Sequence, residues 1–287
     1  MRYVSAKDWA QAPEKRLMLF GMSGLGKTHV SNILRDTGGW FHYSVDYRIG
    51  TRYMGEHIAD GFKAEAMQVP ALERLLKTDS IYIASNITFD NLAPLSDYLG
   101  KPGDPAKGGL PIAEYKRRQA LHHAAEAAAM MDTNHFIDRA QRLYGYSHFV
   151  CDTSGSICEV VDPKDPDDPI LTAVSADMLP VWIEGTDEHT AELVRRFDRA
   201  PKPMCYQPAF LDDAWQTYTV AKGLNENEVD PDDFVRWTFA RALDHRQPRY
   251  RAMADNWGVT VHASDVAQVR TADDMMSLVG AALEARG

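Results

Sequence analysis

The residues with the clearest chemistry lie between Gly21 and Thr28, in the sequence GMSGLGKT. This stretch fits the pattern G-x-x-x-x-G-K-[ST], in which glycines let the backbone approach phosphate oxygens closely. In that pattern Lys27 reaches the β- and γ-phosphates, and the hydroxyl of Thr28 binds Mg²⁺. The sequence therefore predicts binding of a nucleoside triphosphate, with ATP and Mg²⁺ as the expected cofactors.

The sequence on either side of this loop has the context that the pattern requires. The apolar run Leu17 to Phe20 precedes the loop, and a helix-compatible run from His29 to Arg35 follows it. A buried strand, a glycine turn and a helix whose first amides point at an anion are thus expected in that order. The nucleotide contacts are expected from Gly21, Ser23, Gly24, Leu25, Gly26, Lys27, Thr28 and His29.

Two aspartates end apolar runs further along the chain. Asp152 follows His148 to Cys151, and a carboxylate at the end of a central strand can bind Mg²⁺ directly or through water. Asp46 follows Trp40 to Val45 and could accept the proton of a substrate hydroxyl, or orient that hydroxyl. The alternative for each is a helix-capping or turn residue, and the two could also exchange roles.

Arginines form two further groups of candidates. Arg195, Arg196 and Arg199 end a predicted helix and could close over a transferring phosphoryl group as a lid, with catalysis expected from Arg195 or Arg199. Favourable charge at a helix C-terminus is their alternative role. Arg48 and Arg52 lie four residues apart and could bind a carboxylate or phosphate of the substrate together with Asp46, or form surface ion pairs.

Histidines in one long predicted helix have a spacing that imitates a metal site. His122, His123 and Glu126 lie within one turn of each other, but the sequence has no HExxH motif and offers them no obvious partner. We therefore interpret them as part of a solvated helix face.

Apolar runs alternate with helical patterns, which predicts an α/β fold built on a doubly wound parallel sheet of about five strands. The expected strands are Leu17–Phe20, Trp40–Val45, His148–Asp152, Leu179–Ile183 and Val259–His262, with a further short one at Ile81–Ala84. The expected helices outside the middle of the chain are 29–35, 187–197, 209–221, 232–244 and 272–284. Trp215, Tyr218, Trp237 and Phe239 are expected in the core.

Residues 60–145 are expected to form a mainly helical insertion within a single domain that covers residues 1–287. Helices are predicted at 69–77, 91–98, 113–131 and 134–144, and the glycine- and proline-rich stretch 100–111 is predicted to be a loop. This insertion would form an acceptor-binding pocket or a lid.

Composition excludes several classes of protein. The formal net charge of −10 works against nonspecific nucleic-acid binding. The three cysteines, Cys151, Cys158 and Cys205, have neither disulfide-framework nor zinc-ligand spacing and suit a reducing compartment. No apolar run is long enough to span a bilayer, and no signal-peptide core is present, so a cytoplasmic location without membrane contact is expected.

These features together resemble the small P-loop kinases, the group that contains shikimate, gluconate and adenylate kinases. GMSGLGKT has the GxxGxGK[ST] form of that group, and SVDYR at 44–48 is similar to its acidic substrate-binding strand end. LPVWIEGTDEHTAELVRRFDR at 179–199 resembles its lid helix, and RQPRYRAMADNWGVTVHASD at 246–265 resembles its last helix and strand. The resemblance implies that Asp46 contacts the phosphoryl acceptor and that the arginines at 195, 196 and 199 supply lid charge.

The sequence thus favours a Mg²⁺-dependent phosphotransferase that moves the γ-phosphoryl group of ATP to a hydroxyl or phosphate of a small molecule. The strand end CDTSGS at 151–156 differs from the corresponding segments of shikimate and adenylate kinases, so the resemblance does not name the acceptor. One alternative is a regulatory P-loop ATPase switch, although no NKxD signature of a GTPase is present. Another is a kinase that acts on a macromolecule, such as modified nucleic acid or a protein.

Overall fold

The computed structural model describes residues 2–286, which divide into two compact units. The first unit consists of the chain up to Val45, Ala127–Ala200 and the chain from Arg236 onward. The second consists of Asp46–Glu126 and Pro201–Val235. The second unit therefore begins before residue 60, where the predicted insertion starts, and it also includes the later segment Pro201–Val235.

A five-stranded parallel sheet forms the centre of the first unit, in the order β2-β3-β1-β4-β5. This confirms the predicted α/β fold with its parallel sheet. The strands are β1 (Arg16–Phe20), β2 (Trp40–Ser44), β3 (His148–Asp152), β4 (Leu179–Glu184) and β5 (Val259–His262). The predicted strand at 40–45 is one residue too long, because Val45 already starts a helix.

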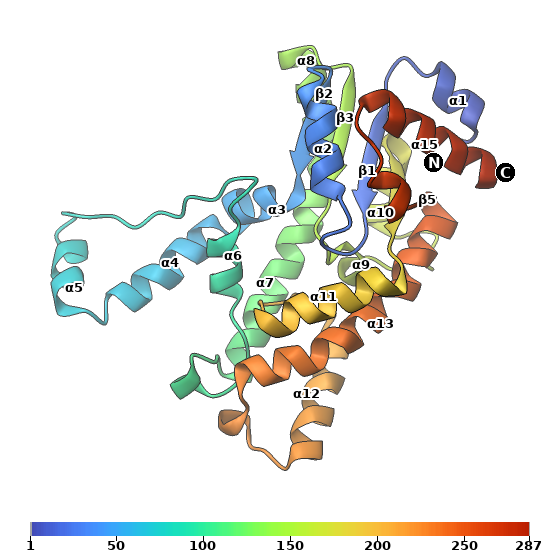
Figure 1. Ribbon diagram of the computed structural model, residues 1–287. Helices are drawn as coiled ribbons and strands as arrows, with labels where there is room; N and C mark the ends of the chain where they lie inside the picture. The colour runs from blue at the N-terminus through green and yellow to red at the C-terminus, as the bar shows by residue number, and fades with distance from the viewer. Residues whose placement is uncertain (1, 287) are drawn as a thin grey trace. The chain divides into compact units, whose positions relative to one another are not determined.

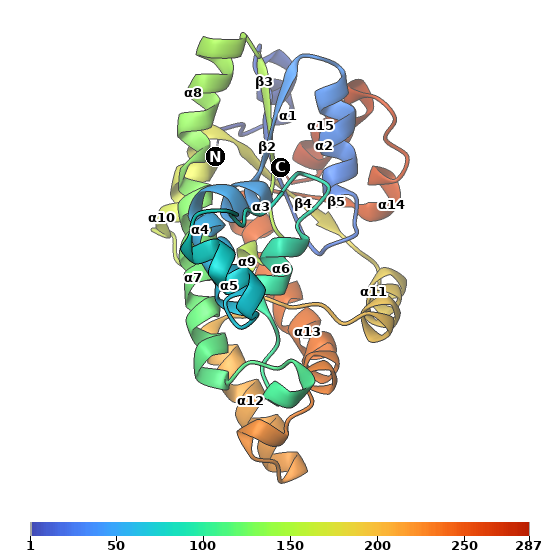
Figure 2. The same cartoon turned by 90° about the vertical axis from the view of Figure 1, so that its left-hand side faces the viewer.

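Helices cover both faces of the sheet, as a doubly wound fold requires. Helices α2 (Lys27–Asp36) and α15 (Ala272–Arg286) pack on one face, and α8 (Thr133–Tyr144) and α10 (Pro169–Asp177) pack on the other. Figure 2 shows these two pairs on opposite sides of the strands, and Figure 1 shows α2 in front of β2 and β3. All five residues of β1 are buried, which explains why its sequence is apolar throughout apart from Arg16.

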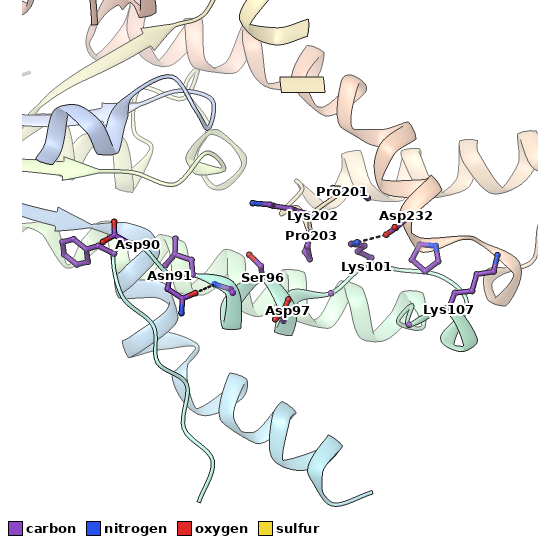
Figure 3. Close-up of a pocket in the computed structure, with 16 residues that line it drawn as sticks. Asp90, Asn91, Ser96, Asp97, Lys101, Lys107, Pro201, Lys202, Pro203 and Asp232 are labelled. Atoms are coloured by element: carbon purple, nitrogen blue, oxygen red, sulfur yellow. Dashed lines mark hydrogen bonds and ion pairs between the residues drawn. The ribbon is translucent and has the colours of Figure 1, made fainter. Parts of the chain in front are cut away.

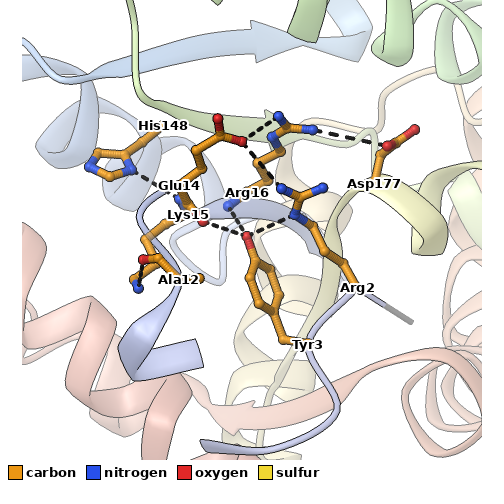
Figure 4. Close-up of polar contacts among 8 residues, drawn as sticks. All are labelled: Arg2, Tyr3, Ala12, Glu14, Lys15, Arg16, His148 and Asp177. Carbon is orange, nitrogen blue, oxygen red and sulfur yellow. Dashed lines mark hydrogen bonds and ion pairs between the residues drawn. The ribbon is translucent and has the colours of Figure 1, made fainter. Parts of the chain in front are cut away.

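Polar contacts fix the start of β1 to the N-terminal segment and to β3 (Figure 4). The hydroxyl of Tyr3 donates to the carbonyl of Glu14 (2.8 Å) and accepts from the backbone N–H of Arg16 (3.1 Å). The backbone N–H of Lys15 donates to Nδ1 of His148 (3.0 Å). Burial, together with the positive charge of Lys15, lowers the pKa of His148, so this imidazole stays neutral and able to accept that bond.

The first unit contains further helices besides these two pairs. They are α1 (Ala6–Gln11), α9 (Ile157–Val160), α11 (Asp187–Arg199) and α14 (Ala263–Val266), with the C-terminal part of α13 (Pro231–Trp257). Helix α13 is much longer than the predicted helix at 232–244. It contains Pro248, which has no backbone N–H and therefore removes one helical hydrogen bond. Side chains on either side of this proline, Arg246 and Tyr250, are buried and anchor the helix.

The second unit is helical. It contains α3 (Val45–Arg48), the π-helix Ile49–Tyr53, α4 (Gly55–Ala66), α5 (Pro70–Lys77), α6 (Ala93–Leu99), α7 (Ile112–Met131), α12 (Pro208–Lys222) and the 3₁₀ turns Pro105–Lys107 and Glu226–Glu228. Helix α4 packs on α6, where Gly61 lies so close to the ring of Tyr98 that a Cβ would sit 2.9 Å from it.

The predicted strand at Ile81–Ala84 is wrong. This segment joins no sheet among residues 2–286, and the side chain of Tyr82 is 88% exposed. A short run of β-formers without a partner strand or a surface to cover gains too little to form a strand. Of the predicted core aromatics, Trp215, Tyr218 and Phe239 are buried and Trp237 is half-buried. No helix within the described chain has both the length and the apolar character needed to cross a membrane.

A buried ion pair joins α9 to α13 within the first unit. Nε of Arg246 donates to Oε1 of Glu159 over 2.6 Å, and the two side chains are 7% and 0% exposed. Nε2 of His245 lies 3.3 Å from the other carboxylate oxygen. Burial by itself raises the pKa of Glu159, but the hydrogen bond from His245 and the charge of Arg246 outweigh it, so the pKa lies below its usual value.

We expect Glu159→Ala to lower the free energy of unfolding by about 3–5 kcal/mol, because it leaves a buried guanidinium without its carboxylate. Urea denaturation followed by circular dichroism measures this change. Glu192→Ala is the matched control, since Glu192 pairs with Arg195 and Arg196 on an exposed helix face, and a much smaller loss of stability is expected there. Equal losses in the two variants would contradict the assignment of the buried pair as a structural contact.

Candidate functional site

The loop between β1 and α2 has the conformation that phosphate binding requires. Gly21, Gly24 and Gly26 have positive φ angles of 134°, 83° and 99°, which side chains rarely permit. A Cβ at Gly21 would also lie 2.7 Å from the carbonyl oxygen of Ile183 in β4. Helix α2 begins directly after Gly26, so its first amides are free to face a bound anion.

Lys27 is held inside this loop. Its side chain is 6% exposed, and Nζ donates to the carbonyl oxygens of Gly21 (2.8 Å) and Met22 (3.0 Å). The ammonium group thus stays at the N-terminus of α2, where its charge adds to that of the helix dipole. Phosphate oxygens that replace these carbonyls would meet a cation already in position.

The structure brings Thr28 and Asp152 together. Oγ1 of Thr28 donates to Oδ2 of Asp152 over 2.7 Å, and Asp152, at the end of β3, is 6% exposed. Strand β3 is the direct neighbour of β1 in the sheet, which is why its last residue lies beside the first turn of α2. Hydroxyl and carboxylate oxygens are preferred ligands of Mg²⁺, so these two can serve one cation directly or through water.

His42 is a further residue of this site, and no motif in the sequence predicted it. Its Nε2 lies 3.8 Å from Oδ2 of Asp152, and its side chain is 1% exposed. The residue lies on β2, two positions before Ser44, which is in register with Asp152. A histidine in the middle of a predicted buried strand was the available signal, and its imidazole limits where the carboxylate can move.

The turn after β3 packs directly on the phosphate loop. A Cβ at Gly155 would lie 2.8 Å from Oγ of Ser23, so a side chain at this position would force the hydroxyl of Ser23 to move. The carbonyl oxygen of Gly155 accepts hydrogen bonds from Nη1 of Arg246 (3.2 Å) and from the hydroxyl of Tyr250. The buried ion pair of Arg246 therefore also positions this turn, which explains the segment CDTSGS in structural terms.

A cavity of about 500 Å³ adjoins the phosphate loop within the first unit. Its apolar part comes from α14 and the residue after it, and its polar part includes His29, His189 and Arg270. The cavity is lined by Gly24, Leu25, Gly26, His29, His189, Ala263, Val266, Ala267 and Arg270. Its volume falls within the range of small-molecule sites.

The three arginines of α11 differ in their surroundings. Arg195 and Arg196 are exposed and both donate to the carboxylate of Glu192, at 2.9 Å and 2.8 Å. Arg199 is exposed, and no ion pair or hydrogen bond engages its side chain among residues 2–286. The structure thus separates one unengaged guanidinium from two that are paired within their own helix.

The predicted acceptor residues begin the second unit. Asp46 and Arg48 lie in α3, immediately after β2, and are half-buried, whereas Arg52 lies in the π-helix and is exposed. The guanidinium of Arg48 lies 5.6 Å from the ring centroid of Tyr53, a cation–π distance. Because Arg48 lies in an α-helix and Arg52 in a π-helix, the two do not share the regular α-helical turn that their spacing predicted.

A second cavity, of about 680 Å³, lies within the second unit and is strongly polar (Figure 3). Lys101 and Lys107 at its rim are paired with Asp232 (2.6 Å) and Asp230 (3.1 Å). Lys202, Asp90 and Asp97 also line it, and within the described residues no ion pair engages them. The cavity therefore offers both signs of charge to a small polar molecule.

The interpretation of His122 and Glu126 as a solvated face is wrong. Their exposures are 5% and 0%, and Nδ1 of His122 lies 3.8 Å from Oε2 of Glu126. The segment that covers this face comes from after residue 200, so its approach could not be deduced from the spacing in the helix.

Comparison with known proteins gives a distant structural similarity. No protein-family model matches this sequence, and no curated protein matches it. Among solved structures, the chain is similar to shikimate kinase from Bacteroides thetaiotaomicron, with 13% identity, a TM-score of 0.37, and coverage of 94% of this chain and 95% of that chain. We therefore define the fold and the site by the geometry described above, and not by this similarity.

We expect Asp152→Asn to remove most of the effect of Mg²⁺ on ATP affinity while the fold survives, because an amide is a poor substitute for a carboxylate ligand. Fluorescence titration with an ATP analogue, with and without Mg²⁺, measures this ratio, and a fall of about tenfold or more is expected. Asp36→Asn, at the exposed end of α2, is the control. A ratio in Asp152→Asn equal to that of the wild type would mean that this carboxylate does not organise the cation.

Proposed function

We propose that this protein is an ATP-dependent phosphotransferase that moves the γ-phosphoryl group to a hydroxyl or phosphate of a small molecule, with Mg²⁺ as cofactor. The observation that carries the proposal is the constellation of the buried Lys27 in the phosphate loop and the 2.7 Å contact between Thr28 and Asp152. These groups support the proposal, because catalysis of phosphoryl transfer consists mainly of positioning and of neutralising negative charge.

The donor half of the proposed reaction is assigned to the first unit. Backbone amides at the start of α2 and the ammonium of Lys27 bind the phosphates, while Thr28 and Asp152 hold Mg²⁺, which neutralises charge on them when bound. His42 restricts the carboxylate of Asp152. The cavity beside His29 and Arg270 is proposed to take the nucleoside, since apolar residues from α14 offer a surface for a flat base.

The acceptor half is assigned to the second unit. Asp46 is proposed to accept the proton of the acceptor hydroxyl as its oxygen bonds to the γ-phosphorus and ADP leaves. Arg48 and Arg52 are proposed to bind an anionic group of the acceptor. The cavity at Lys202 and Asp97 suits a small molecule that carries hydroxyl and charged groups, because it presents both a cation and carboxylates.

Lid charge is proposed to come from α11. Arg199 is the favoured residue over Arg195, because Arg195 would first have to leave the carboxylate of Glu192. The guanidinium of Arg199 lies at the end of a helix and directly before a segment with prolines, and it is proposed to close over the phosphoryl group by a movement of that helix end. The three buried cysteines form no disulfide within the described residues, which fits the proposed cytoplasmic location.

We expect Lys27→Ala to abolish ATP-dependent phosphorylation of an acceptor, with a loss of about 100-fold or more in kcat/KM, because the γ-phosphoryl charge loses its main cation. The acceptor is first sought by incubating the protein with ATP and a metabolite extract and detecting a mass gain of one phosphoryl group. Lys164→Ala, in an exposed loop of the same unit, is the control.

The same incubation separates the proposal from the alternatives. Release of phosphate at the full rate in water alone, with no phosphorylated metabolite, would overturn it in favour of an ATPase switch. Phosphate transfer only to added protein or nucleic acid would favour a macromolecular acceptor, and binding to nucleic acid that weakens steeply with salt would accompany that outcome.

We expect Asp46→Asn to leave ATP affinity within about twofold of the wild type and to lower the rate of transfer by about 100-fold or more, because only the proton acceptor is lost. Nucleotide titration and acceptor phosphorylation are measured on the same sample. Asp60→Asn, which breaks only an exposed pair with Lys63, is the control. A collapse of ATP affinity in Asp46→Asn would instead make Asp46 a metal or structural residue.

A further inference from the structure

Three buried side chains in the second unit form a cluster that the proposed phosphotransferase does not use. His122 and Glu126 project from α7, and Cys205 comes from the segment before α12. Their nitrogen, oxygen and sulfur atoms all lie within 4.8 Å of one another, and the three residues are 5%, 0% and 6% exposed. We propose that His122, Glu126 and Cys205 bind a zinc ion.

One face of α7 is built to hold Cys205 in place. Tyr115 and Gln119 lie on the same face as His122 and Glu126, at helical spacings of three and four residues. The hydroxyl of Tyr115 and Nε2 of Gln119 each donate to the carbonyl oxygen of residue 204, both at 2.9 Å. The backbone N–H of residue 206 donates to Oε1 of Gln119, also at 2.9 Å. Three hydrogen bonds thus bracket Cys205 and direct it to this helix face.

His122 is available as a ligand. Within residues 2–286 its Nδ1 has no hydrogen-bond partner, because the distance of 3.8 Å to Oε2 of Glu126 is too long for one. A buried polar atom without a partner is costly, and a metal ion would satisfy it.

The chemistry of the three ligands selects the metal. Thiolate, imidazole and carboxylate together are typical of Zn²⁺, whereas Mg²⁺ and Ca²⁺ prefer oxygen ligands only. Zn²⁺ with one thiolate and one carboxylate is neutral overall, which suits a site without solvent. Bonds of about 2.0–2.3 Å place tetrahedral ligands about 3.5 Å apart, so the cluster must contract by about 1 Å at its widest. Three protein ligands leave the fourth position for water.

The position of the cluster gives the ion a structural consequence. Glu126 ends the first of the two chain segments that make up the second unit, and Cys205 lies near the start of the other. The ion would therefore clip these two segments together, and such clips stabilise most when they join residues far apart in the sequence. Metal binding would release the thiol proton of Cys205.

Cobalt titration of the full-length, nucleotide-free protein tests the proposal, since Co²⁺ substitutes for Zn²⁺ and is coloured when bound to thiolate. We expect one Co²⁺ per chain with a sulfur charge-transfer band, displaced by Zn²⁺. Cys205→Ser should lose the band and weaken Zn²⁺ binding by about 100-fold or more, and Glu126→Gln by about tenfold or more. Cys158→Ser, another buried cysteine, should bind as the wild type does.

X-ray absorption of the zinc-loaded wild type gives an answer that does not depend on the folding of any variant. We expect one sulfur at about 2.3 Å and nitrogen or oxygen ligands at about 2.0–2.2 Å. A zinc environment without sulfur, or Cys205→Ser with unchanged zinc affinity, would overturn the proposal. Failure of ATP-dependent transfer would leave it intact, because the site is measured without nucleotide.

Discussion

The structure of the first unit depends on one steric constraint, the close packing around the loop between β1 and α2, which leaves little room for a side chain at Gly21 or at Gly155. At Gly21 the obstacle is the carbonyl of Ile183 in β4, and at Gly155 the obstacle is Ser23 of the loop itself. The loop is therefore held from both neighbouring strands. This close packing lets the backbone of the loop turn sharply before α2, as a phosphate-binding loop requires. The contact of Thr28 with Asp152 follows from the same arrangement.

Much of the first unit could be predicted because its strands are buried on both faces. Parallel strands of that kind are continuous apolar runs, and β1 and β4 stand out from the sequence for that reason. The carboxylate at the end of β3 could be placed as well, since the ends of parallel strands meet at one edge of the sheet. His42 was missed, because a histidine within a buried strand signals a polar contact but has no spacing pattern that identifies the partner.

The second unit was harder to predict, for a physical reason. Its helices bury their faces against segments that lie far away in the sequence, so the periodicity of one helix does not say which face is covered. His122 and Glu126 became interior residues only because the segment around Cys205 packs on them. The reverse case is Ile81–Ala84, which has the composition of a strand but pairs with no other strand in the described chain, since tertiary context decides strand formation.

The resting position of Lys27 has a calorimetric consequence. Its ammonium is already out of water and its side chain already fixed by two carbonyl oxygens, so its rotamer entropy is lost when the chain folds and not when the ligand arrives. In the proposed association with a triphosphate, two neutral acceptors at this ammonium would be replaced by charged ones. The enthalpy of that binding would then come from stronger hydrogen bonds, and little entropy would be lost in fixing the side chain of Lys27.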